Sequence, residues 1–333
     1  MNVELDNLDK NLLNIIQADF PLVREPLSAL GLGLGITGDE AIHRIDRLKA
    51  GGIIRLIGPV FNPKKLGYQT TLVAAKVPLE QLETAGQIIS KHPMVSHCYQ
   101  RDHDLNLWFT LAISVAEDME AEVRKLGNSI ESETTLNLPA IKTFKIVVYF
   151  APGGRNSDLS SPAKRGNLIL APGDGNKLSA VDRAVINALQ QDLPLIERPF
   201  DVIAAKLPMD ADKFLSQCET LLQRGIMRRF SASINQYRLG YISNAMLCWQ
   251  VPSDMVDKTG KKIATFTEVS HCYERQTNRL WPHNLFAMIH ARSNENCHAV
   301  IDKICKQTGL NRKEMLLLFS TKEVKKTRVQ YKV

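Results

Sequence analysis

The spacing of apolar residues in the first fifty positions predicts three short helices. Apolar side chains in residues 6–18 recur at the interval of one helical face, and a second apolar segment covers 27–34. Thr37 and Glu40 have the spacing of a capping box, so they open a third amphipathic helix. That helix ends at Gly51.

Two short apolar segments, 53–57 and 60–61, follow the third helix and predict a pair of strands. Three helices followed by such a β-wing are the order of a winged helix-turn-helix domain. We assign this domain to residues 1–64.

Residues 65–150 alternate between strand and helix patterns. The predicted order is βαββαβ, which is the plan of a ferredoxin-like domain, an antiparallel sheet with helices on one face. The predicted strands are 70–77, 95–101, 106–114 and 141–150, and the predicted helices are 79–91 and 115–127.

The second half of the chain repeats the first. Leu66-Gly67-Tyr68 returns as Leu239-Gly240-Tyr241, 173 positions later. This repeat predicts a second winged helix-turn-helix at 179–237 and a second ferredoxin-like domain at 238–333. Residues 151–178 are rich in Pro, Gly and Ser and are interpreted as a linker. The predicted fold class is α+β, a tandem repeat of a winged helix-turn-helix and a ferredoxin-like (βαββαβ) domain.

Composition narrows the class of protein. The hydrophobic share of 44% in 333 residues is ordinary for a globular chain, and no apolar run reaches membrane-spanning length. We expect a cytoplasmic protein without a membrane partner. The six cysteines form no C-x-x-C pair, which argues against a zinc finger or a redox dithiol. A formal charge of +7 favours an anionic partner, either nucleic acid or a polycarboxylate or phosphate ligand.

The two predicted third helices differ in charge, which argues against DNA binding. A pair of half-site readers would keep both helices basic, because contacts with phosphate need cations. The first copy has His43, Arg44, Arg47 and Lys49, whereas the second has Lys213, Gln217, Glu219 and Gln223. We therefore expect no DNA partner.

One polar segment occurs twice: Val95-Ser-His-Cys-Tyr-Gln-Arg101 returns as Val269-Ser-His-Cys-Tyr-Glu-Arg275. Alternate side chains of a strand share a face, so each copy presents a row of imidazole, phenol and guanidinium, with Ser96, Cys98 and Gln100 on the opposite face. Such a row offers a proton donor, an amphipathic wall and a carboxylate clamp. A solvent-facing strand is the alternative, which the repetition disfavours. The rows are His97, Tyr99 and Arg101, and His271, Tyr273 and Arg275.

Further histidines and aromatic residues follow each arginine. They would suit a flat, anionic macrocycle whose iron takes an imidazole ligand. No His/Cys/Asp/Glu set has the spacing of a dedicated metal site. We interpret the remaining histidines, 43, 92, 290 and 298, as surface or packing residues. The candidate residues are His103, Asn106 and Trp108 in the first copy, and Trp281, His283 and Asn284 in the second.

Longer segments carry a resemblance to known families. The segment from Arg44 to Arg55, followed by Phe61-Asn-Pro-Lys-Lys-Leu-Gly-Tyr68, resembles the leucine-responsive/AsnC transcription regulators. His97-Cys-Tyr-Gln-Arg-Asp-His-Asp-Leu-Asn-Leu-Trp-Phe-Thr110, together with His271-Cys-Tyr-Glu-Arg275 and Trp281-Pro-His-Asn-Leu-Phe286, is similar to sirohaem decarboxylases built on that regulator fold.

The resemblance implies a fused two-subunit enzyme, of the kind associated with haem d1 synthesis, whose separate-subunit relatives serve an alternative haem route. The implied carboxy-lyase reaction removes carbon dioxide from two acetate side chains of sirohaem to give didecarboxysirohaem. His283 and Phe286 depart from the aromatic and the tryptophan expected there, which leaves open which half is catalytic. We expect the sheet domains to pair within one chain as a pseudo-dimer, with further self-association left open.

The residues then take the following expected roles. His97 and His271 act as acid/base residues, while Arg101 and Arg275 orient carboxylates. His103 or His283 is the candidate axial ligand of the substrate iron, and no cofactor beyond that iron is expected. The expected substrate-binding set is Tyr99, His103, Asn106, Trp108, Tyr273, Trp281, His283 and Asn284. A tetrapyrrole-responsive regulator and a sirohaem carrier are the alternatives.

Overall fold

The computed structural model describes residues 4–147, 149–152 and 177–333, so most of the predicted linker, 151–178, lies outside the described residues. The chain forms two compact units, and each unit combines both copies of the repeat. One unit contains the N-terminal helices of each copy, and the other contains the strands and helices that follow Gly67 and Leu239. The α+β tandem repeat is confirmed.

The helical unit contains three helices from each copy, and side-chain caps start the first and third of each set. Asp6 and Asp9 form a reciprocal capping box on the first helix, and Ser179 and Asp182 form the same box in the second copy. Thr37 caps the third helix through the Glu40 backbone N–H, as predicted. The helices are α1 (Asn7–Ala18), α2 (Pro26–Leu34), α3 (Gly38–Ala50), α6 (Ala180–Leu189), α7 (Pro199–Ala204) and α8 (Ala211–Gln223).

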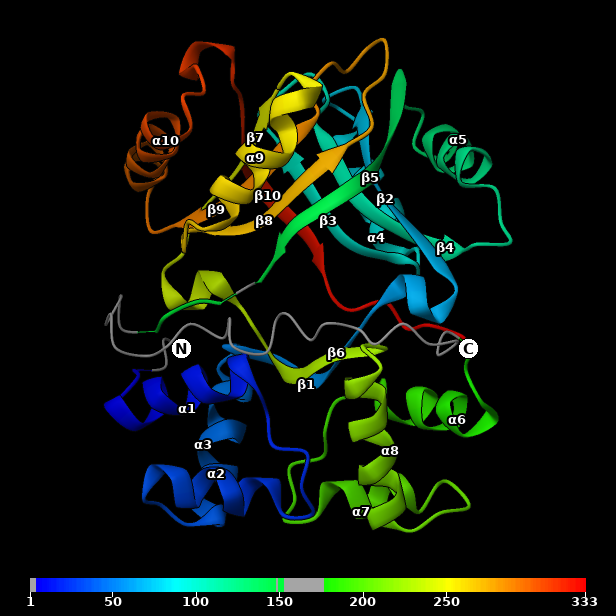
Figure 1. Ribbon diagram of the computed structural model, residues 1–333, viewed down its shortest axis with the longest axis vertical. Helices are drawn as coiled ribbons and strands as arrows, with labels where there is room; N and C mark the ends of the chain where they lie inside the picture. The colour runs from blue at the N-terminus through cyan, green and yellow to red at the C-terminus, as the bar shows by residue number, and fades with distance from the viewer. Residues whose placement is uncertain (1–3, 148, 153–176) are drawn as a thin grey trace. The chain divides into compact units, whose positions relative to one another are not determined.

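The β-wing predicted within each copy is wrong. Each copy contributes one continuous strand, and β1 (Ile54–Phe61) pairs antiparallel with β6 (Met227–Ile234), as Figure 1 shows. Pro59, which stands between the two predicted segments, lies within the strand opposite Phe230. A proline is tolerated there because a two-stranded sheet leaves one side of each strand without a ladder partner. The partner strand comes from the other copy, so no pattern within one copy could reveal it.

Basic residues of α3 are engaged by acids of the same domain. Arg44 lies 2.7 Å from Asp6 and 2.9 Å from the buried Asp9, and Arg47 also pairs with Asp9. In the second copy, Asp182 accepts hydrogen bonds from Gln217 at 2.6 Å and from Arg224. These contacts give the α3 arginines a structural role.

The strands of both copies form one closed eight-stranded barrel, in the order β10-β3-β4-β2-β5-β8-β9-β7. Within each copy the order is that of a ferredoxin-like sheet, β3-β4-β2-β5 and β8-β9-β7-β10. The strands of the first copy are β2 (Tyr68–Lys76), β3 (Val95–Arg101), β4 (Leu107–Ser114) and β5 (Thr134–Ile146). Those of the second are β7 (Ser243–Trp249), β8 (Val269–Arg275), β9 (Leu285–Ala291) and β10 (Leu316–Lys326).

The last strand of each copy joins the two sheets. Residues 134–139 of β5 pair with β2 of the same copy, and residues 140–146 pair with β8 of the other copy. β10 does the same, pairing first with β7 and then with β3. The strand predicted at 141–150 is therefore misplaced, because Pro139 hid its first half. The expected pairing of the two sheet domains within one chain is confirmed.

Four helices lie on the outside of the barrel: α4 (Leu82–Lys91), α5 (Met119–Ser129), α9 (Ser253–Ala264) and α10 (Asn294–Thr308), as Figure 1 shows. Alternate strand residues, including Cys98 and Cys272, pack beneath these helices, and Cys98 thus lies on the face that alternation predicted. The other face of each strand fills the barrel with side chains such as Leu72, Trp108 and Leu318. No helix in the described part of the chain combines the length and the apolar character needed to cross a membrane.

Gly86 and Gly260 occupy equivalent positions in the two copies, and they test the pairing of each copy's last strand with the other copy. A methyl group added at Gly260 in α9 would overlap the Phe144 ring of β5, which belongs to the other copy. At the equivalent Gly86 in α4, the neighbour is Val324 of β10, at an ordinary 3.4 Å. We expect Gly260→Ala to lower the free energy of unfolding by about 1–3 kcal/mol in urea titrations. Gly86→Ala should be neutral or stabilising by up to about 1 kcal/mol. Equal effects would contradict this packing.

Candidate active site in the barrel

A cavity of about 280 Å³ lies inside the barrel, and both copies contribute to its lining. The two predicted rows meet there, although equivalent residues such as His97 and His271 lie 174 positions apart in the sequence (271 − 97). Its polar lining includes Ser96, His97, Tyr99, Arg101 and Thr110 from the first copy, and Asn244, His271, Tyr273, Arg275, His290 and Lys326 from the second. Its apolar lining includes Leu72, Trp108, Phe109, Met246, Phe286 and Met288.

Strand alternation correctly placed each imidazole, phenol and guanidinium on one face, but it was wrong for Ser96. The pairing of β3 with β4 shifts register between Val95 and His97, and Ser96 therefore lines the cavity beside His97. This irregularity brings the Ser96 hydroxyl into the site, whereas strict alternation would place it on the other face of the strand. β8 has the same register shift between Val269 and His271.

A serine hydroxyl orients each histidine of the two rows. Ser96 Oγ lies 2.9 Å from His97 Nδ1 and 2.7 Å from Thr110 Oγ1. In the second copy, Ser270 Oγ lies 2.9 Å from His271 Nδ1. The ring of each histidine stacks on the tyrosine two residues later, with centroids 6.4 Å apart in the first copy and 6.1 Å apart in the second. Stacking and the hydroxyl contact together limit the rotation of each imidazole.

The two arginines are buried cations that face the cavity. Arg101 donates to the Leu318 carbonyl at 2.9 Å, and Arg275 donates to the Leu138 carbonyl at 2.7 Å. The guanidinium carbon of Arg275 lies 4.8 Å from the Tyr273 ring centroid, a cation–π contact. Arg275 forms no ion pair within the described residues, and burial lowers its pKa to about 10. A buried guanidinium that meets only a carbonyl and aromatic faces is ready to bind a carboxylate.

His290 is part of the site, and its interpretation as a surface or packing residue is wrong. Its Nδ1 lies 3.1 Å from Ser270 Oγ, and its Nε2 lies 3.4 Å from Asn244 Nδ2. Enclosure in the barrel lowers its pKa well below the usual value, and Lys326 and His271 lower it further. Alternation along β9 could have identified it, because it shares a face with Phe286 and Met288.

The structure places Asn106 and Asn284 outside the residues that line the cavity, and their expected contact with substrate stays a prediction. The Asn106 amide donates to the Val77 carbonyl at 2.7 Å and accepts from the Val77 N–H at 3.0 Å. Asn284 makes the same pair of contacts with Val251, both at 2.8 Å. Each amide thus makes the two hydrogen bonds that the backbone of a neighbouring strand would make. These bonds fix Asn106 in the loop before β4 and Asn284 in the loop before β9.

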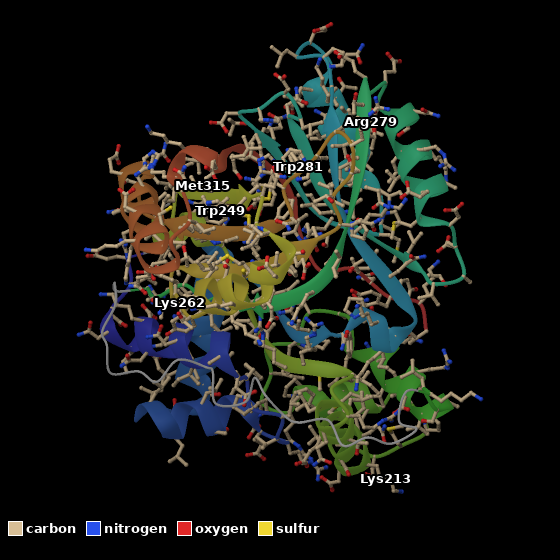
Figure 2. All side chains as sticks on the ribbon, turned by 45° about the horizontal axis from the view of Figure 1, so that its top comes forward. Lys213, Trp249, Lys262, Arg279, Trp281 and Met315 are labelled. Atoms are coloured by element: carbon tan, nitrogen blue, oxygen red, sulfur yellow. The ribbon has the colours of Figure 1, made fainter. Side chains whose placement is uncertain are left out.

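His103, Trp281 and His283 form an aromatic cluster with Trp108, and only Trp108 of these lines the cavity. Trp281 lies 5.3 Å from Trp108, 6.1 Å from His103 and 5.1 Å from His283, measured between ring centroids. Figure 2 shows Trp281 and Arg279 on the segment between β8 and β9. Burial lowers the pKa of His283, and His103 adds to the effect. The two candidate iron ligands, His103 and His283, therefore come from one loop of each copy, and both contact Trp281.

Within the described residues, no group of three or more His, Cys, Asp or Glu side chains could hold a metal ion.

The fold and cavity define a class: an AsnC-type regulator fold whose fused sheets enclose a site for an anionic ligand. Comparison with known proteins supports this class. The model "AsnC-like ligand binding domain" matches residues 65–145 and 238–325. The model "Siroheme decarboxylase NirDL-like HTH domain" matches residues 9–55 and 182–228.

Full-length relatives identify the family. The chain is 36% identical over 321 residues to the "Siroheme decarboxylase" of Hydrogenobacter thermophilus, covering 96% of this chain and 93% of that protein. It is 32% identical to the "Siroheme decarboxylase NirDL subunit" of Paracoccus denitrificans, covering 96% and 95%. A crystal structure of siroheme decarboxylase NirDL with an iron-uroporphyrin III analogue superposes with a TM-score of 0.71 at 33% identity, covering 98% and 95%. The chain belongs to the sirohaem decarboxylase family.

The buried His290 predicts a pH dependence of stability. An unfolded histidine titrates near pH 6.5, whereas the pKa of His290 in the folded protein is well below this value because of burial. As the pH falls below about 6.5, the unfolded chain binds a proton that the folded protein does not bind, so the free energy of unfolding decreases. We expect urea titrations at about pH 7.5 and about pH 5.5 to show a smaller decrease for His290→Gln than for the wild type. Parallel decreases would contradict the assigned environment.

Proposed function

We propose that this protein is a sirohaem decarboxylase that removes carbon dioxide from two acetate side chains of sirohaem, giving didecarboxysirohaem. One observation carries the proposal: two rows of histidine, tyrosine and arginine line a single cavity in a chain of this family. Sirohaem combines a flat apolar body with several carboxylates. Buried guanidinium groups beside aromatic and aliphatic walls match that combination.

The chemical step is a cleavage of the bond between the acetate methylene carbon and its carboxyl carbon. Carbon dioxide leaves, and the bonding electron pair remains on the methylene carbon, where the conjugated macrocycle can delocalise it. A proton is then transferred from an imidazolium to this carbon, which becomes a methyl group. The protein must therefore bind the carboxylates, exclude water and hold a proton donor beside each reacting carbon.

His97 and His271 are the proposed proton donors. Each lines the cavity, and an imidazole can act as a general acid. The serine contact engages Nδ1 of each ring, and Nε2 is the proposed donor atom. Stacking on Tyr99 and Tyr273 keeps the rings in this orientation.

Arg101 and Arg275 are the proposed carboxylate anchors. Both are buried, at 5% and 8% exposure, so a bound carboxylate would meet a desolvated cation. Such a contact is strongest where water is excluded. We assign the axial contact with the substrate iron to His103 or His283, and we propose that no cofactor beyond this iron takes part.

The reaction itself is the first test. The purified protein, incubated with sirohaem without oxygen, should yield a tetrapyrrole whose mass is lower by two carbon dioxide units. The measurement is a mass spectrum of the extracted pigment, with heat-denatured protein as the control. Sirohaem that binds and is recovered with its mass unchanged would favour a carrier or a tetrapyrrole-responsive regulator. This result would contradict the proposal.

The proposed anchor Arg275 should oppose stability while it supports binding. Arg275→Met keeps most of the side-chain volume but removes a buried charge that has no carboxylate partner. We expect an unchanged or higher free energy of unfolding, because the desolvation cost disappears. Binding of sirohaem, followed by its absorption spectrum, should weaken by about 30-fold or more, which is about 2 kcal/mol.

Arg279→Met is the matched control, since Arg279 is exposed on the segment between β8 and β9. It should leave both stability and sirohaem binding unchanged. If Arg275→Met binds sirohaem as tightly as the wild type, Arg275 is not an anchor.

A further inference from the structure

The two rows have different neighbours, although their own residues are the same. In the first copy, the strand beside His97 presents Thr110, and two positions later Ala112. In the second copy, the strand beside His271 presents Met288, and two positions later His290. The serine of the first copy therefore meets a hydroxyl, whereas the serine of the second copy meets a second imidazole.

These contacts form a chain of polar groups across three adjacent strands. His271 Nδ1 lies 2.9 Å from Ser270 Oγ, which lies 3.1 Å from His290 Nδ1. His290 Nε2 lies 3.4 Å from the Asn244 side-chain amide. A longer contact of 3.3 Å joins Ser270 Oγ to the Met288 carbonyl. The chain runs from β8 through β9 to β7, and its imidazoles and amide line the cavity.

The orientation of the Asn244 amide sets the direction of this chain. Asn244 Oδ1 is buried and meets no donor among the described residues, while Nδ2 lies beside His290 Nε2. The two ends of an amide have nearly the same shape, and in the half-turned orientation the oxygen lies beside His290 Nε2 and the nitrogen takes the place of the oxygen. His290 then donates from Nε2 to Asn244 and accepts at Nδ1 from the Ser270 hydroxyl. Because this hydroxyl has one proton, Ser270 must accept from His271 Nδ1.

The first copy has no such direction. Ser96 and Thr110 are both hydroxyls, and each can donate or accept. Thr110 Oγ1 also accepts from the His97 backbone N–H at 3.1 Å, which is compatible with either direction of the contact with Ser96. The contact between Ser96 and Thr110 therefore does not set the proton on His97 Nδ1, whereas the contact between Ser270 and His290 sets the proton on His271 Nδ1.

We propose that His290 is a positioning residue, which acts through Ser270 to hold a proton on His271 Nδ1 and so stabilises the imidazolium that delivers its Nε2 proton to the substrate carbon. The two halves of the cavity then differ in proton supply. One of the two decarboxylations depends on the Asn244–His290–Ser270–His271 chain, and the other does not. This inference rests on the proposed decarboxylase function.

The charges around His290 keep it in the neutral form that this role requires. The groups that act on it are Lys326 from β10, His271 from β8, and Arg101 and His97 from β3. All of them are cationic or become cationic, and together with burial they lower the pKa of His290. A neutral imidazole can accept at one nitrogen and donate from the other, which a protonated one cannot.

The test is a single-turnover reaction of the full-length protein with sirohaem, in which mass spectra follow the loss of each carbon dioxide. We expect His290→Ala to slow one of the two losses by about 10–100-fold, so that singly decarboxylated tetrapyrrole accumulates. Without its acceptor chain, the His271 imidazolium is less stable. The high-pH limit of the slowed step should therefore move to lower pH, while the other step keeps its pH profile.

Ser270→Ala should reproduce both effects, and His290→Gln should restore part of the rate, because its amide can accept from Ser270 and donate to Asn244. His43→Ala, on the exposed face of α3, is the control that should leave both steps unchanged. Spectral titration with sirohaem and a urea titration show whether each variant still binds and folds.

The outcomes separate this inference from the function on which it depends. If the wild-type protein releases no carbon dioxide, the proposed function fails. If the wild type releases two, and folded His290→Ala and Ser270→Ala slow both losses equally or leave the pH profile unchanged, the positioning role of His290 is overturned.

Discussion

The pairing of each copy's last strand with the other copy is the constraint on which the rest of the sheet unit depends. β5 leaves β2 at residue 139 and continues along β8, and β10 leaves β7 and continues along β3. Two open sheets would each expose unpaired backbone at their edges, whereas the closed barrel has no free edge. Closure also turns the inner faces of both sheets toward one another. The shared cavity follows from this closure.

Within that cavity, burial lowers the pKa values of Arg275 and His290. Arg275 retains a charge in a place where charge is costly, and His290 is held neutral by the same enclosure and by neighbouring cations. Both effects have a cost in the free protein. In the proposed reaction, a substrate carboxylate would exchange its hydration for a guanidinium contact, and the neutral imidazole would direct a proton.

The duplication supplies two similar rows, and the differences between the copies make them chemically distinct. The histidine, tyrosine and arginine of each row agree in position, in stacking and in their contact with a serine. The differences lie one strand away, where Thr110 and Ala112 correspond to Met288 and His290. A fused chain can vary these neighbours independently in each copy. A symmetric dimer of identical subunits has no such freedom.

The sequence by itself determined the repeated domains, most helices, and the common face of each His–Tyr–Arg row, because these depend on local periodicity and on alternation along a strand. Recurrence of one polar segment also identified the residues that meet in the cavity. Only the tertiary structure decided which strands pair between copies, since the partners of β1 and of the second half of β5 lie far away in sequence and Pro59 and Pro139 masked them. It also showed that Asn106 and Asn284 bond to the backbone of Val77 and Val251, and that His290 lines the cavity. Those assignments depend on which side chain faces which across the barrel, and no local pattern contains that information.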